Sequence, residues 1–257
     1  MNKTNAVISF NLFYVLLGVI SLFLIDDLLL ILPVWLFLAF GNGTAGHRYL
    51  GHSQFETSKF MHWVLVLWCT VSAYSVPLYW QVQHKHHHRN TDKDTDIHSP
   101  VNGYWQALFL WAFNQQRLDS VFIERASKVS MAKALKDPAI KFTSTYFIAI
   151  NLMFLTLLSI IDLNLTFAIG IAFCLEHIRL GLINTICHTA NFPGNYRNHS
   201  TGDLSQNNII LGIISLGFGW HNNHHADPKK LILTENWWEI DLEGLLGKLL
   251  SKETYER

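Results

Sequence analysis

The sequence is poor in charged residues. Asp, Glu, Lys and Arg make up 15% of its 257 residues, and their formal charges cancel at pH 7. An ordinary globular domain carries about 25% charged residues. Half of the residues here are hydrophobic, so the composition indicates a protein of the lipid bilayer. A net charge of zero gives no support for a nucleic-acid partner, and we expect none.

Cysteine is also scarce. The chain has only three, Cys69, Cys174 and Cys187, and their scattered positions fit neither a disulfide framework nor a thiolate metal site. This usage favours a reduced, cytosol-facing chemistry. Histidine is the residue in excess, with 14 copies, and the functional signal lies there.

Four apolar stretches are long enough to cross a membrane, because about 20 helical residues span ~30 Å of hydrocarbon. The predicted spans are residues 6–25, 28–46, 142–161 and 165–183. Asp26 and Asp27 break the first pair, and Asp162–Asn164 breaks the second, which predicts two helical hairpins. Buried helices of a soluble protein are the alternative, but such helices seldom run this far without a polar face. Two other apolar stretches, Phe60–Trp80 and Gly103–Phe113, are predicted to lie in the membrane interface.

Lys and Arg are absent from two long stretches, residues 4–47 and 142–178. Because cytosolic segments of membrane proteins are enriched in Lys and Arg, we expect both termini and the cap, residues 47–141 and 184–257, in the cytosol. The sequence thus predicts one domain over residues 1–257. Its fold class is an all-α integral membrane protein, with four transmembrane helices and a cytosolic helical cap.

Four histidine-rich motifs follow the ends of the predicted spans: HRYLGH, HKHHH, NTICH and HNNHH. The candidate metal-site residues in them are His47, His52, His84, His87, His88, Asn184, His188, His221, His224 and His225. A single histidine is more often an ordinary polar residue, and we expect this of His62, His177 and His199. Two copies of HxxHH with two further motifs at the same side of the spans favour a metal site.

Helix geometry orders these histidines. At about 100° per residue, His84, His87 and His88 share one face and His86 points to the opposite one. The same spacing recurs in HNNHH, and NTICH has an Asn and a His four residues apart. His47 and His52 would lie about 140° apart in an α-helix, which predicts that they flank the site.

Nine imidazoles exceed the needs of one metal ion, since a structural zinc takes four ligands. Two ions with four or five ligands each would use all nine, and a nitrogen set without thiolates fits iron that reacts with O₂. A ligating imidazole usually hydrogen-bonds through its second nitrogen. The candidates for that supporting role are the interspersed acids Asp92, Asp94, Asp96 and Asp203. His98 is a candidate for a supporting or a substrate-contact role.

The motifs HRYLGH, WQVQHKHHHRNTDKDTDIH, NTICH and GWHNNHH, in this order and with these separations, resemble those of the membrane-bound fatty acid desaturase family, in its stearoyl-CoA/Δ9 acyl desaturase branch. The likeness covers nearly the whole chain. It implies a mushroom-shaped helical protein whose cap encloses a di-iron centre, with the nine histidines as ligands and Asn184 bound through a water. Trp80 matches a family Trp that shapes the acyl tunnel, which implies a substrate-binding role.

The resemblance also implies O₂-dependent desaturation of a saturated C16–C18 acyl thioester, with acyl-CoA as the expected carrier, O₂ as co-substrate, and a cis Δ9 double bond as the product. Two Fe²⁺ ions are the expected cofactor. The electrons would come from a separate ferredoxin, rubredoxin or cytochrome b5 with a reductase. Membrane lipid is a further partner, and the bacterial inner membrane is the expected location.

The chain departs from the family pattern at a few positions. Phe218 stands where an acid is common, and Ile97 replaces a usual Pro. Leu180 and Gly181 replace a Thr and a bulky aromatic residue, which predicts a wider tunnel and a changed chain length or double-bond position. Glu176 and Arg179, three residues apart in the fourth span, are expected to pair inside the bundle.

Two alternative functions remain open on the sequence. The same centre in a relative performs hydroxylation or forms an acetylenic bond, or acts on a lipid-esterified chain, and ligand spacing does not separate these outcomes. A metal transporter or sensor without catalysis is the alternative of another class. Transport calls for ligands inside the spans, whereas these clusters gather at one side.

Overall fold

The computed structural model describes residues 3–72 and 74–252, and they are mostly helical. The first half of the chain contains α1 (Lys3–Leu24), η1 (Leu28–Leu30), α2 (Ile31–Phe40), η2 (Gly41–Gly51), α3 (Lys59–Ser72), α4 (Pro77–Asn90), η3 (Pro100–Asn102), α5 (Tyr104–Leu108), η4 (Leu110–Ala112), α6 (Gln115–Ile123) and α7 (Arg125–Ala134). The second half contains α8 (Pro138–Thr145), α9 (Phe147–Ile161), α10 (Leu163–Ile186), β1 (Asn195–Tyr196), β2 (Asn207–Asn208), α11 (Ile209–Ile214), α12 (His221–Ala226) and α13 (Leu242–Leu250). The two strands pair antiparallel.

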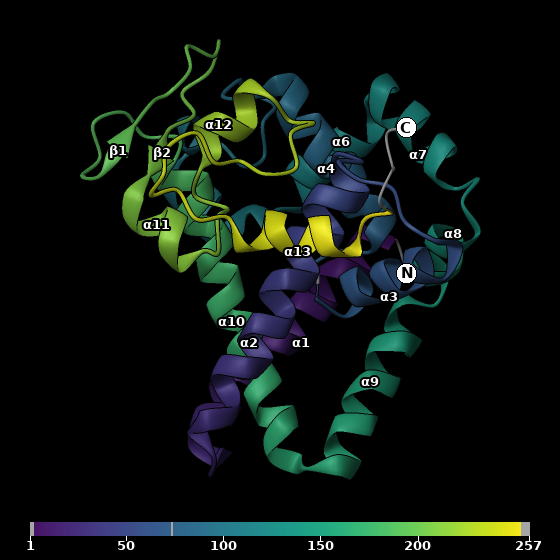
Figure 1. Cartoon of the computed structure of the whole chain (residues 1–257). Coiled ribbons are helices and arrows are strands. Elements are labelled where there is room, and N and C mark those ends of the chain that lie inside the picture. The colour runs from purple at the N-terminus through teal and green to yellow at the C-terminus, as the bar shows by residue number, and fades with distance from the viewer. Residues whose placement is uncertain (1–2, 73, 253–257) are drawn as a thin grey trace.

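Long apolar helices project from one side of a cap of shorter elements (Figure 1). Three helical stretches of the described chain are long and apolar enough to cross a membrane: Thr4–Leu24, Leu28–Gly51 and Leu163–Ile186. They match the first, second and fourth predicted spans, although the second and fourth continue a few residues further into the cap.

The third predicted span, residues 142–161, is not one straight helix. α8 and α9 meet at Tyr146 with a bend of 74°, and α9 alone has 15 residues. α3 and α4 form a second bent pair, at 81°, so the stretch Phe60–Trp80 predicted to lie in the interface consists of α3 and the start of α4. With each bent pair taken as one span, the described chain has up to five, and the four-span count stays a prediction.

The two hairpin turns lie side by side at the end remote from the cap. The backbone N–H of Asp26 donates to Asn164 Oδ1 at 2.9 Å, and the Asp27 carboxylate caps η1 while Asp162 caps α10. α1 and α10 pack along their length, where Gly18 and Gly170 let the two backbones approach closely. The turns are thus at one end of the bundle and the histidine motifs at the other. That the whole of residues 1–257 forms one domain stays a prediction, and the termini themselves, residues 1–2 and 253–257, lie outside the described residues.

Candidate metal centre

The nine histidines of the four motifs lie together in two groups. In each group every residue offers a ligand atom, and these atoms lie within 4.8 Å of one another. The first group is His47, His52, His84, His88 and His224. The second group is His87, His188, His221 and His225.

The spacing of the ring nitrogens suits a metal ion at the middle of each group. In the first group, His47 Nε2 lies 3.1 Å from His224 Nε2, which lies 3.0 Å from His88 Nε2. In the second, His221 Nε2 lies 3.0 Å from His188 Nε2 and 3.1 Å from His225 Nε2. Two imidazoles bound at right angles to an ion about 2.1 Å away would have nitrogens roughly 3.0 Å apart. The donor set and its spacing therefore fit two nitrogen-ligated ions.

Each HxxHH motif contributes to both groups. His84 and His88 of α4 point to the first group while His87 points to the second. His224 of α12 joins the first group, and its neighbour His225 joins the second. The two groups are adjacent, since the rings of His88 and His225 have centroids 4.6 Å apart.

His47 and His52 meet because the chain around them is not an α-helix. Residues Gly41–Gly51 form a π-helix, and the N–H of His52 donates to the carbonyl of His47 at 3.1 Å. A π-helix is closed by hydrogen bonds between residues i and i+5, and both rings offer a ligand atom to the first group. The α-helical angle of about 140° therefore does not apply to this segment, and that the two histidines flank the site stays a prediction.

Glycines allow this segment to pack closely. A Cβ on Gly43 would lie 1.9 Å from the Glu243 carboxylate carbon, and one on Gly41 would lie 2.2 Å from Ser72 Oγ. A Cβ on Gly46 would lie 2.9 Å from the Trp80 indole nitrogen. The Gly-rich sequence just before the first motif is thus matched by neighbours that leave no room for side chains.

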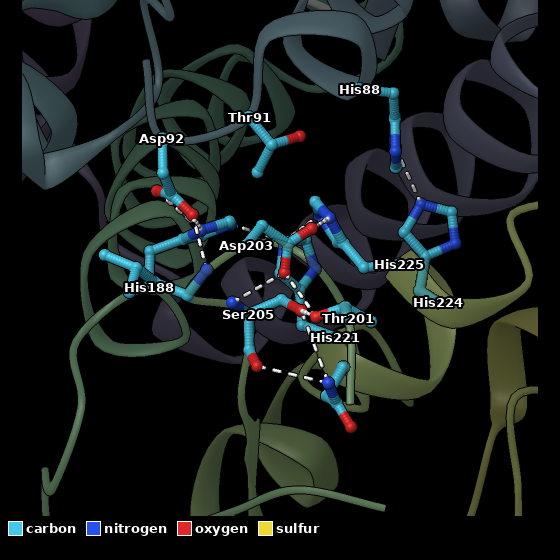
Figure 2. A network of polar contacts seen from close by, with 12 residues as sticks. His88, Thr91, Asp92, His188, Thr201, Asp203, Ser205, His221, His224 and His225 are labelled. Carbon is cyan, nitrogen blue, oxygen red and sulfur yellow. Dashed lines mark hydrogen bonds and ion pairs between the residues drawn. The ribbon is translucent and has the colours of Figure 1, made fainter. Parts of the chain in front are cut away.

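Carboxylates support three imidazoles of the second group, and Figure 2 shows two of these pairs. Asp203 Oδ2 accepts a hydrogen bond from His225 Nδ1 at 2.8 Å, and Asp92 Oδ1 accepts one from His188 Nδ1 at 3.1 Å. Asp96 Oδ2 lies 2.9 Å from His87 Nδ1. A carboxylate behind a ligating imidazole fixes its tautomer and increases its basicity. Asp96 and Asp203 therefore lie where a supporting role requires, and Asp92 has an equivalent position.

These carboxylates are held in the ionised state. Burial alone would raise the pKa of Asp203, but the hydrogen bonds from His225, Ser205 and Thr201 lower it below its usual range. Burial is likewise outweighed at Asp96, where contact with His87 lowers the carboxyl pKa.

Burial keeps several imidazoles of the centre neutral, which is the form that binds a metal. It lowers the pKa of His52 to about 3 and that of His225 to about 4. The pKa of His221 and that of His224 are also lowered by burial. The Nδ1 atoms of His221 and His224 have no hydrogen-bond partner among the described residues.

Four of the five other histidines lie apart from the two groups. His86 points away and contacts Glu124 Oε2 and the Thr95 carbonyl, as its helix position predicts. His62 lies between Tyr49 and Asp137, and His177 contacts the Phe109 carbonyl. His199 lies 3.6 Å from Glu235.

His98 is buried beside the second group. Its backbone N–H donates to Asp96 Oδ1 at 2.9 Å, and its ring lies between His87 and Trp111, with centroid distances of 5.4 and 5.1 Å. A ligand atom of His98 is also close to both His87 and Asp96. Its supporting role stays a prediction.

A small cavity of about 20 Å³ opens between the two groups, which is room for one water-sized molecule. Its polar wall is His84, His87, His98, Asn184 and His221. Its apolar wall is Trp80, Trp111, Leu180, Ile183 and Phe218. Trp80 stacks on His84, with ring centroids 5.7 Å apart. An apolar substrate reaching this cavity would meet both histidine groups.

Gly181 does not widen this cavity. A Cβ at that position would lie 2.0 Å from the carbonyl oxygen of Leu108, so the backbone of α5 fills the space of the missing side chain. Trp111 also lines the cavity. The sequence does not predict Trp111 as a site residue, because it predicts only that the apolar stretch Gly103–Phe113 lies in the membrane interface.

A buried ion network lies behind the first group. Arg179 Nη2 is 2.7 Å from Glu176 Oε1, as the predicted pair requires, and Arg179 Nη1 is 3.0 Å from Glu243 Oε1. Arg48 pairs with Asp241 at 2.7 Å. Burial raises the pKa of the Glu243 carboxyl to about 7. The network joins α10, η2 and α13. The sequence predicted the Glu176–Arg179 pair but not the pairs of Arg179 with Glu243 and of Arg48 with Asp241.

Phe218 lies between this network and the histidines. Its ring centroid is 4.5 Å from that of His47 and 5.2 Å from the Arg179 guanidinium carbon. In place of an acid, the chain thus has an aromatic ring that separates the Arg179 charge from the first group.

These elements define a helical membrane protein with a histidine centre at one end of its apolar helices. A family model described as "Fatty acid desaturase" matches residues 27–239, and the chain belongs to the fatty acid desaturase family.

Similar proteins differ in the substrates that their names state. The chain is 29% identical to Delta-9 acyl-lipid desaturase 1 of Arabidopsis thaliana over 204 residues, which are 79% of this chain and 65% of that protein. It is 30% identical to the acyl-CoA C20 Delta5-desaturase of Anemone leveillei over 216 residues, 82% of this chain and 66% of that protein. It is 29% identical to the sn-1 stearoyl-lipid 9-desaturase of Anabaena variabilis over 225 residues, with 86% and 78% covered. The chain spans just under two thirds of the length of the first two relatives.

Proposed function

We propose that this protein is an O₂-dependent acyl desaturase that introduces a cis double bond, most simply at Δ9, into a saturated C16–C18 chain. The observation that carries the proposal is the pair of imidazole groups on either side of a partly apolar cavity. Two relatives with Δ9 or 9-desaturase in their names support the position of the bond.

The nine histidines would hold two iron ions, five at one and four at the other, and Asn184 would reach one of them through a water. Bound iron would supply the O₂-dependent oxidation that removes two hydrogens from adjacent methylenes, with water as co-product. The second group, backed by Asp92, Asp96 and Asp203, would bind its ion with the more basic imidazoles.

The side chains of the apolar wall would position the substrate. Trp80, Leu180 and Phe218 line the cavity, and holding one methylene pair there would select the bond that is oxidised. At about 20 Å³ the cavity admits only the reacting part of a chain. Binding of a whole acyl chain therefore requires these side chains to move apart.

We propose an acyl-CoA as the carrier of the chain, and a lipid-esterified chain is the alternative that the names of two relatives support. Electrons would come from a ferredoxin, rubredoxin or cytochrome b5 with its reductase. The charge bias of the sequence supports four spans with the histidine centre in the cytosol. The bacterial inner membrane is the proposed location.

Expression in bacteria that lack monoenoic acids of this type, followed by gas chromatography–mass spectrometry of the fatty acids, tests the proposal. Wild type should yield a new monoenoic acid, and His87→Ala should yield none. His199→Ala, outside the two groups and partly exposed, should behave like wild type. A hydroxylated or acetylenic acid would favour the alternative chemistry, and unchanged fatty acids with folded, iron-loaded protein would refute desaturation.

A further inference from the structure

The short helix α11 has an apolar outer face. Ile209, Ile210, Ile213 and Ile214 are 44–63% exposed, whereas Leu211 and Gly212 are buried. The surrounding residues 204–220 contain no Asp, Glu, Lys or Arg. A contiguous exposed apolar patch of this kind marks an interaction site.

Helix α13 has a similar face. Leu242, Leu245 and Leu249 are 42%, 47% and 81% exposed, and their spacing puts them on one side of the helix. The opposite side, which includes Glu243, is buried against the ion network. We call the four isoleucines of α11 and these three leucines of α13 the apolar rim.

Arg179 fixes the level of both helices. Its Nη1 donates to the carbonyl of Ser215, the residue that caps the C-terminus of α11, at 3.0 Å, and to Glu243 Oε1 of α13, also at 3.0 Å. Arg179 lies within the membrane-spanning helix α10, seven residues before its end at Ile186. At 1.5 Å per residue, that is about 10 Å below the end of the helix. Figure 1 shows α11 and α13 at the level where α10 and α2 enter the cap.

We infer that the apolar rim is inserted in the cap-side leaflet of the membrane. At this level the exposed side chains of α10 itself, Leu175 and Ile178, are apolar, so the rim continues a lipid-facing surface. Interfacial helices bury an apolar face about 5–10 Å into the boundary of headgroups and acyl chains. Exposed Trp237, just before α13, has the side chain that prefers this boundary.

Insertion of the rim would hold the histidine centre at a fixed height over the membrane. Gly212 of α11 packs directly on the ring of Trp220, where a Cβ would lie 2.2 Å from the ring atoms. Trp220 immediately precedes His221 of the second group. The contact between Gly212 and Trp220 therefore links α11, in the leaflet, to α12. Insertion of the rim does not depend on which reaction the centre performs.

Fluorescence quenching in nanodiscs tests this inference on the full chain. A Cys174→Ser background removes the partly exposed cysteine, since Cys69 and Cys187 are buried. An environment-sensitive label is then attached to Ile213→Cys or Leu245→Cys. The control is Val129→Cys on α7, which is 64% exposed in a part of the cap remote from the spans.

Labels at 213 and 245 should be quenched by lipids with a spin label on the acyl chain and protected from aqueous iodide, and the label at 129 should show the reverse. Iodide quenching at 213 and 245 equal to that at 129 would overturn the inference, because the rim would then face water. Protection from both quenchers would also overturn it, because a protein surface would then cover the rim. The two positions lie on separate helices, so that failure of one variant to fold leaves the other as the test.

Discussion

At the scale of single residues, the two histidine groups differ in what stands behind them. His87, His188 and His225 of the second group each contact a carboxylate. Among the described residues, no carboxylate is hydrogen-bonded to a ring nitrogen of the first group. If both groups hold ions, the second should hold its ion with more basic ligands and the first with a larger number of ligands.

Asp203→Asn tests this difference. An amide in place of the carboxylate removes the charge that supports His225, and loss of such a partner typically lowers metal affinity about 10–100-fold. Chelator competition with inductively coupled plasma mass spectrometry of the retained iron measures the effect, and one ion per chain should be lost first. Asp227→Asn, an exposed carboxylate at the end of α12, is the matched control and should retain iron as wild type does. Equal retention in both variants would contradict a supporting role for Asp203.

The sequence predicts contacts between residues close together in the chain better than contacts between distant ones. The shared face of His84, His87 and His88 follows from helix periodicity alone, because those residues lie within one and a half turns. The contact of Asp92 with His188 joins residues 96 positions apart, and no local rule specifies such a pair. The division of one HxxHH motif between two groups has the same origin, since it depends on where the other motifs lie in space.

At the scale of elements, close backbone contacts position the helices around the cavity. α10 and α5 touch at Gly181, and η2 touches α13 at Gly43 and α4 at Gly46. These contacts fix which side chains face the centre. The π-helical winding of Gly41–Gly51 could not be predicted from an α-helical period.

Gly181→Ala should destabilise the protein. The new Cβ would lie 2.0 Å from the Leu108 carbonyl oxygen, and overpacking of this kind costs typically about 1–3 kcal/mol. A thermal unfolding scan in detergent should show a lower midpoint. Gly202→Ala, with no atom within 4 Å of the new Cβ, should unfold like wild type. The same midpoint in both variants would mean that the α5–α10 contact is loose.

At the scale of the whole molecule, the charge pattern of the sequence and the geometry of the fold both distinguish an end with the tight turns from an end with the histidine motifs. The tight turns are linked by the Asp26–Asn164 hydrogen bond, and the histidine motifs gather at the opposite end. Composition and hydropathy predicted three of the helices closely. The third predicted span is bent at Tyr146. The sequence did not predict this bend, because hydropathy reports how apolar a stretch is and not whether its helix stays straight.

The orientation of the spans is open to a labelling test. In a Cys174→Ser background, Asp26→Cys in the exposed turn should react with an impermeant maleimide added to spheroplasts. Ser200→Cys, exposed in the cap, should react only after the membrane is opened. The reverse pattern would mean that the histidine centre faces away from the cytosol.

The content of iron per chain tests the central claim most directly. Protein purified from iron-replete cells should contain two irons by elemental analysis against quantitative amino-acid analysis. His52→Ala, in the first group, and His221→Ala, in the second, should each retain about one iron, while His199→Ala retains two. One metal per chain in the wild type, or zinc alone, would contradict a centre built from two separate imidazole groups.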